Sequence, residues 1–184
     1  MPEHRTEKHP QTPWHFPVVV DDVPATGEHF DLVADANVRR MVAQLSGLRD
    51  LSRLQASFDV RRRGAAGLHV TGRVSATVGQ TCVVTLEPIA NEVDEEVDLL
   101  FEPAQPVAED KSDEAAVRHD KWDDPEPLVD GTVDLGALAT EFLVLGLDPY
   151  PRKPGAVFQP THDTTPDAGP FAALGALKKD RDGR

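Results

Sequence analysis

The chain has one cysteine, Cys82, in the stretch TVGQTCVVTLEPIA, and its chemistry is the first question that the sequence raises. A zinc site would need histidine and carboxylate ligands as well, but the seven histidines show no close ligand spacing. A catalytic thiolate needs a cation or a helix N-terminus beside it, whereas Cys82 follows an apolar strand pattern. We therefore expect an inert, mostly buried thiol, with no metal and no cofactor.

Carboxylate pairs are a second possible source of chemistry. Asp94-Glu95-Glu96 and Asp123-Asp124 both lie in strongly acidic surroundings, which is typical of a solvated surface. General acid-base catalysis instead needs one carboxyl group held in an apolar pocket. The chain also lacks a phosphate loop, a nucleophile elbow and a dinucleotide fingerprint. We expect no catalytic residues and no enzymatic activity.

Arginine is concentrated in one part of the chain, and guanidinium groups bind phosphates well. Between residues 39 and 73, eight arginines face two aspartates, which gives a net charge of +6. Alternating apolar residues on both sides of the turn sequence GAAG, at 64–67, predict a β-hairpin. The apolar side chains fall on even numbers, so five basic residues with odd numbers share the outer face: Arg53, Arg61, Arg63, His69 and Arg73. These are our candidate RNA-binding residues.

A neighbouring acidic strand offers these basic residues a different partner. Between residues 92 and 130, 15 acidic residues face three basic ones, a net charge of −12 in a chain of net charge −13. Alternation over 93–101 predicts a third strand with an acidic outer face, and Glu95 is its one charge on the inward side. Carboxylates of this strand would then face the arginines across the sheet. The hairpin also lacks outward aromatic side chains for base stacking. RNA contact and internal ion pairing both stay open.

The remaining pattern predicts an α+β fold, with an antiparallel β-sheet packed with about two α-helices and disordered N- and C-terminal tails. Residues 1–12 form the first tail, 13–150 the single domain and 151–184 a proline-rich tail with a short helical island at 171–178. We expect a first strand over 14–20, an acidic mobile loop over 103–130, and helices over about 32–48 and 134–147. Asp31 and Asp134 are the expected N-caps of these helices.

Length and composition exclude several classes of protein. No stretch of the 184 residues approaches the ~18 apolar residues of a membrane span, and the N-terminus has no apolar signal-peptide core. A single cysteine agrees with a reducing compartment. We expect a cytoplasmic protein without a membrane or DNA partner.

Three blocks of sequence resemble a known family: TCVVTLEPIANEVDEEVDLLFEP, GTVDLGALATEFLVLGLDPYPRKPG and PFAALGALK. They are similar to the YceD-like family of large ribosomal RNA subunit accumulation proteins, and LDPYPRKPG resembles the alphaproteobacterial branch. The resemblance implies a non-enzymatic ribosome-biogenesis factor that supports accumulation of 23S ribosomal RNA. Its implied partner is 23S rRNA or a pre-50S particle. The alternative is an acidic protein-protein adaptor or chaperone-like module for a basic ribosomal protein.

The same resemblance marks family-motif positions, which we interpret mostly as caps, turns and core. Glu141 is the exception, because we expect a carboxylate on an apolar helix to form an ion pair, for example with an arginine. Cys82 is similar to the second member of a Cys-x-x-Cys pair found in many relatives, but the first position is Gly79 here, so this chain cannot repeat the pair. The marked positions are Cys82, Leu86, Pro88, Phe101, Pro103, Asp134, Leu135, Glu141, Pro149, Pro151, Pro170, Phe171, Leu174, Leu177 and Lys178.

Overall fold

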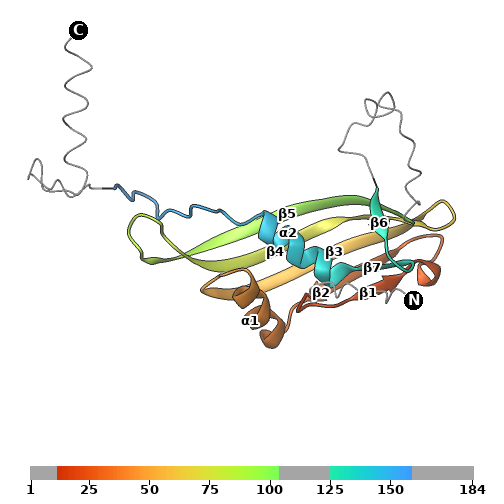
Figure 1. The fold of residues 1–184 in the computed structure, drawn as a ribbon, viewed down its shortest axis with the longest axis horizontal. Coiled ribbons are helices and arrows are strands. Elements are labelled where there is room, and N and C mark those ends of the chain that lie inside the picture. The colour runs from red at the N-terminus through yellow and green to blue at the C-terminus, as the bar shows by residue number, and fades with distance from the viewer. Residues whose placement is uncertain (1–11, 104–124, 159–184) are drawn as a thin grey trace, which may run out of the picture. The chain divides into compact units, whose positions relative to one another are not determined.

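The computed structural model describes residues 12–103 and 125–158. Contacts divide the chain into two units, Met1–Pro154 and Gly155–Arg184, and all the elements below belong to the first. The helices are η1 (Val20–Asp22, a 3-10 turn), α1 (Ala36–Leu45) and α2 (Leu135–Leu145), and the strands are β1 (Pro17–Val19), β2 (Glu28–Val33), β3 (Asp50–Arg63), β4 (Gly67–Thr81), β5 (Pro88–Pro103), β6 (Glu126–Leu128) and β7 (Thr132–Asp134) (Figure 1). The predicted α+β class is confirmed.

The main sheet has the strand order β2-β3-β4-β5-β6, and β1 pairs separately with β7. Every neighbouring pair in it is antiparallel except β5 and β6, which run parallel. The strands β3, β4 and β5 are long, at 14, 15 and 16 residues. Their register places Ser57 opposite Arg73, and Arg73 opposite Glu96. The basic and acidic strands are therefore direct neighbours.

The core lies between the inner face of this sheet and α2, which crosses that face in Figure 1. Even-numbered side chains of β3 and β4, such as Phe58, Val60 and Val74, have no exposed surface. From α2, Leu135 and Leu143 are also fully buried. The alternation that predicted the hairpin is therefore confirmed: the sheet has one buried apolar face and one polar face.

The first predicted helix is wrong at its start. Residues 28–33 form β2 and pair with β3, so Leu32, the expected first helical residue, is a buried strand residue. The cap is Asp35 and not Asp31, because the Asp35 carboxylate accepts from the backbone N–H groups of Asn37 and Val38 at 2.8 Å each. Pairing with β3 satisfies the backbone of β2, which local helical spacing could not reveal.

The other boundaries change less. The first strand is shorter than expected, at Pro17–Val19, while the helix N-cap at Asp134 is confirmed. The expected acidic loop over 103–130 contains β6, and its residues 104–124 lie outside the described part of the chain. The two tails, residues 1–11 and 159–184, and with them the island at 171–178, also lie outside it.

Candidate nucleic-acid interface

All five predicted RNA-binding residues lie on β3 and β4 at the outward positions that alternation predicts. Arg61 and His69 are direct cross-strand neighbours. Arg53 and Arg63, however, are separated by ten residues of β3, which corresponds to roughly 33 Å along a strand. The basic residues therefore follow the length of the sheet and do not form one compact patch.

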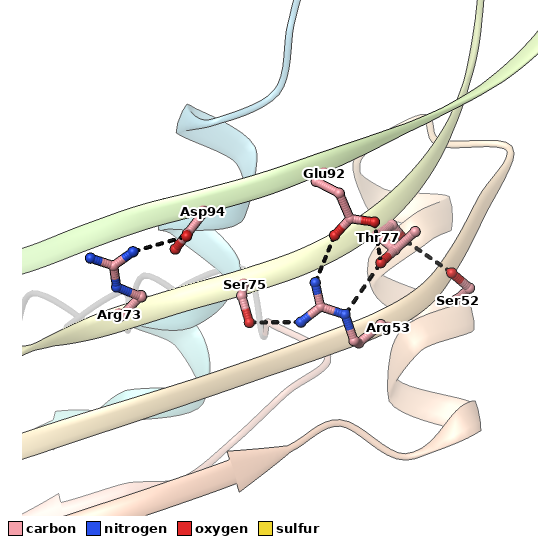
Figure 2. A network of polar contacts seen from close by, with 7 residues as sticks. All are labelled: Ser52, Arg53, Arg73, Ser75, Thr77, Glu92 and Asp94. Atoms are coloured by element: carbon pink, nitrogen blue, oxygen red, sulfur yellow. Dashed lines mark hydrogen bonds and ion pairs between the residues drawn. The ribbon is translucent and has the colours of Figure 1, made fainter.

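Arg53 is held by a network of hydroxyl and carboxylate groups across three strands (Figure 2). Its Nε and Nη1 atoms donate to Thr77 Oγ1 at 3.2 Å and to Ser75 Oγ at 2.9 Å. Its Nη2 atom donates to Glu92 Oε2 at 2.7 Å, and Thr77 Oγ1 donates to the other oxygen of Glu92. Hydrogen bonds from Thr77 and then Arg53 lower the pKa of Glu92. The guanidinium group of Arg53 is thus already occupied.

Three of the other four candidates have carboxylate partners on β5 as well. Arg73 donates to Asp94 at 2.9 Å, as Figure 2 shows, and to Glu96 at 2.6 Å. The remaining contacts are His69 Nε2 with Asp98 at 2.7 Å and Arg63 Nε with Glu102 at 3.8 Å. Internal pairing, which the sequence left open, is therefore the arrangement that the structure contains.

Arg61 differs from the other four basic residues. Within residues 12–103 and 125–158 it has no ion pair, and its side chain lies against Gly27, the residue before β2. An incoming phosphate could bind it directly. At the other four positions a phosphate would have to replace a carboxylate, which would then face the negative nucleic acid unpaired.

One histidine with two aspartate partners, which sequence reasoning missed, lies on the same face where β2 pairs with β3. His29 Nδ1 contacts Asp59 at 3.0 Å and its Nε2 contacts Asp31 at 3.3 Å. The hydrogen bond to Asp59 is the largest cause of a raised pKa for His29, and Asp31 raises it further. The sequence alone does not indicate this contact, because His29 faces Asp59 only when residues 28–33 form a strand paired with β3.

Cys82 lies in the β4–β5 connection and has no exposed surface, so its predicted burial is confirmed. Its Sγ accepts from the backbone N–H groups of Lys153 at 3.3 Å and Thr85 at 3.4 Å. The Lys153 amide, followed by donors from Thr85, lowers the pKa of the thiol to about 6 despite burial. Apolar burial alone would raise it. The thiol thus acts as a hydrogen-bond acceptor that joins two segments of the chain.

The segments joined at Cys82 are two blocks of the family motif. Val83 donates its backbone N–H to Pro151 O at 2.9 Å, and Lys153 Nζ contacts Glu87 at 2.9 Å. Leu86 in this loop has φ = 60°, a left-handed conformation that is uncommon for leucine, yet its side chain is 74% exposed. Backbone strain without burial marks this loop as a second surface of interest.

The other family-motif residues that the structure describes include a helix cap, a strand end and exposed positions. Asp134 caps α2 by accepting from Gly136 and Ala137 at 3.0 Å each, and Pro88 begins β5. Pro149 and Glu141 are exposed, and the ion pairs of the described residues include no partner for Glu141. Pro170 and Phe171 lie outside the described part of the chain.

Metal binding and membrane crossing each require a recognisable arrangement of residues. Within the described ranges, no group of three His, Cys, Asp or Glu side chains is arranged to hold a metal ion. Among the helices described, none combines the length and apolar character that crossing a membrane requires.

The geometry first defines a class: an α+β protein in which one face of a long antiparallel sheet packs on a helix and the other carries alternating basic and acidic strands. The family model described as "Large ribosomal RNA subunit accumulation protein YceD" matches residues 70–178, more than half of the chain, and the chain belongs to that family. No curated protein and no solved structure matches it. The family assignment is thereby confirmed, while the alphaproteobacterial branch stays a prediction.

The range of the family match, residues 70–178, includes some of the candidate residues and excludes others. It contains all the family-motif positions, but Arg73 is the only one of the five basic hairpin residues within it. Family membership therefore gives no support for RNA binding by the other four, Arg53, Arg61, Arg63 and His69. Such a role rests on their geometry in this chain.

Proposed function

We propose that this protein supports the accumulation of 23S ribosomal RNA by binding that RNA, or the pre-50S particle that contains it, without catalysing a reaction. Membership of the family named for large-subunit ribosomal RNA accumulation is the observation that carries the proposal. The site of action would be the cytoplasm, where ribosomal subunits are assembled.

The outer face of the hairpin supports a contact that involves exchange of ion pairs. Arg61 has no ion pair among the described residues, and Arg63 has only a long one, at 3.8 Å from Glu102. Phosphates would meet these two arginines first, at the turn end of the hairpin. Arg73 and Arg53 would join only if RNA displaced the β5 carboxylates, so their contribution should be smaller.

Binding to overlapping 23S rRNA fragments across a salt series tests the proposal. If all five basic residues, the four arginines and a protonated His69, contact phosphates of single-stranded RNA, log affinity falls against log salt with a slope of roughly −3.5. A variant with Arg61, Arg63 and Arg73 changed to Gln, checked for folding by circular dichroism, measures the share of the hairpin. Absence of saturable binding at low salt would contradict direct RNA binding.

A second candidate function, an adaptor for a basic ribosomal protein, is favoured by β5. This strand contains six acidic residues and no basic ones. Along residues 88–100 it has no hydrogen-bonded strand on its far side within the described chain, since β6 pairs only with Phe101–Pro103. An extended basic segment could add to this edge through main-chain hydrogen bonds.

The two functions give opposite results when β5 is neutralised. Changing Asp94 to Asn and Glu96 to Gln removes charge that repels RNA and releases Arg73, so RNA should bind more tightly. The same change should weaken a basic protein partner. Paired titrations of the variant with RNA and with purified basic large-subunit proteins distinguish the candidates.

A further inference from the structure

A hollow of about 600 Å³ lies between α1 and the start of β3, away from the hairpin turn. Its size falls within the range of about 300–1,000 Å³ that is usual for ligand sites. Its apolar lining comes from Ala36, Ala43, Leu48 and Leu51. Three arginines also line it, Arg39 and Arg40 from α1 and Arg49 from the connection to β3, against one acidic residue, Asp50, so the net charge of the lining is +2.

The arginines of this hollow differ from those of the hairpin in their partners. Arg39 donates to the backbone oxygen of Ala34 at 2.7 Å, and Arg40 donates to the side-chain oxygen of Asn37. Both acceptors are neutral. Each uses one of the five N–H donors of its arginine and leaves the other four for a ligand. Within residues 12–103 and 125–158, none of the three arginines has a carboxylate within ion-pair distance.

The backbone that presents these side chains is well fixed. Asp35 caps α1, and the backbone N–H of Arg49 donates to Gly79 O on β4 at 2.9 Å. Asp50, the one acidic side chain, has its Cβ directly beside Gly79. The positive groups are therefore held on rigid elements, which lowers the entropy cost of binding an anion.

We propose that this hollow binds the phosphate backbone of RNA, with Arg40 and Arg49 as the direct phosphate contacts and Arg39 adding positive charge from the wall. The inference rests on the proposed function and assigns its contact to a different surface. A phosphate that binds here displaces no carboxylate, whereas at Arg53 or Arg73 it must displace one. On the hairpin only Arg61 shares this property within the described residues, and it is a single arginine, whereas the hollow has three. The apolar lining can receive the ribose, and no aromatic side chain lines the hollow to select a base. Binding through it should be largely independent of sequence.

The test uses the full-length protein and the 23S rRNA fragments of the salt series. The variant R40Q/R49Q removes two exposed charges without touching the core. Loss of two phosphate contacts should reduce the salt slope by about 1.4 for single strands or 1.8 for duplexes, which at ~0.1 M salt corresponds to roughly 25-fold to 60-fold weaker binding. R40K/R49K keeps both charges and should retain most of the affinity. R61Q/R63Q is the comparison variant, since it removes the same charge from the turn end of the hairpin, the other surface that offers arginines to phosphate.

Each outcome decides between the surfaces. A loss of this size in R40Q/R49Q, a smaller loss in R61Q/R63Q and rescue by the lysine variant support the hollow, provided that thermal unfolding shows all variants folded. RNA binding by R40Q/R49Q within about twofold of the unchanged protein overturns the inference and leaves the proposed function standing. Equal losses in R40Q/R49Q and R61Q/R63Q also overturn it, because the hollow would then contribute no more to RNA binding than the hairpin does. If the unchanged protein binds no fragment, direct RNA binding fails as well.

Discussion

Replacing Gly72 with alanine should destabilise the sheet more than any other single methyl group added to β4. Gly72 lies opposite Phe58 on β3 and Val97 on β5. A Cβ atom at this position would overlap the backbone oxygen of Ser57 and would be 2.8 Å from Cδ1 of Phe58. A rotamer change of Phe58 can relieve the second contact. It cannot relieve the first, because the Ser57 carbonyl belongs to the strand itself.

The size of the effect follows from two opposing contributions. Overpacking that shifts backbone costs about 3 kcal/mol or somewhat more, while the reduced entropy of the unfolded chain returns about 0.4–1 kcal/mol. We therefore expect a net loss of roughly 2–3 kcal/mol. With a typical urea m-value of about 2 kcal/mol/M, the unfolding midpoint should fall by about 1–1.5 M.

Urea titration followed by circular dichroism measures this change, with Gly79→Ala as the matched control in the same strand. At Gly79 the nearest atom to an added Cβ is Asp50 Cβ at 3.0 Å, on the first residue of β3, which can yield. We expect a change below about 1 kcal/mol for the control. If the free energy of unfolding of Gly72→Ala lies within about 0.5 kcal/mol of that of the unchanged protein, the close approach of β3 and β4 that we describe is wrong.

Three further predictions concern titrating side chains. Burial alone would raise the pKa of Asp134, but the N–H groups of Phe16 and Ala137 and the His15 side chain lower it, so its stabilisation is present above a pH of about 4 and lost as pH falls through the lowered value. Asp134→Ala should cost about 1–2 kcal/mol at neutral pH in urea titrations, and a cost unchanged in acid would contradict this. The Cys82 pKa is lowered from 9.0 to about 6, so its stabilisation is complete above pH 9.0 and lost as pH falls through about 6. Cys82→Ser should remove that dependence, measured by thermal unfolding, and an unchanged pH profile would refute it. His29 has a raised pKa, so its stabilisation is present below pH 6.5 and lost as pH rises through the raised value. NMR titration of the ring should show the raised value, and Asp59→Asn should bring it back toward 6.5.

The hairpin and its outer face could be predicted because alternation is a local property of the sequence. Apolar residues from Leu54 to Val60 report burial directly, and the inward position of Glu95 followed from the same count. Its carboxylate lies beside Gly146 at the end of α2, which is the inner side of the sheet. Likewise Asp134 was recognisable as a cap from its type and place before an apolar run.

What the sequence did not reveal depends on pairing between distant segments. The strand at 28–33 exists because β3 supplies its hydrogen bonds, and the two amides on Cys82 come partly from a residue 71 positions away. The hollow at Arg40 and Arg49 needs the end of α1 to face the start of β3. Its arginines were counted in the net charge of +6, but only the register shows which basic residues are matched with acids.

The acidic side chains of β5 have a consequence for how copies of this protein meet. An exposed strand edge is a template for pairing with the edge of another molecule, and long edges lead to aggregation. If two copies paired through β5, Glu92, Asp94 and Glu96 of each would lie close to the same residues of the other, and like charges would repel. The carboxylates that hold the arginines of one sheet thus also keep neighbouring sheets apart, a protection that acid or high salt should weaken.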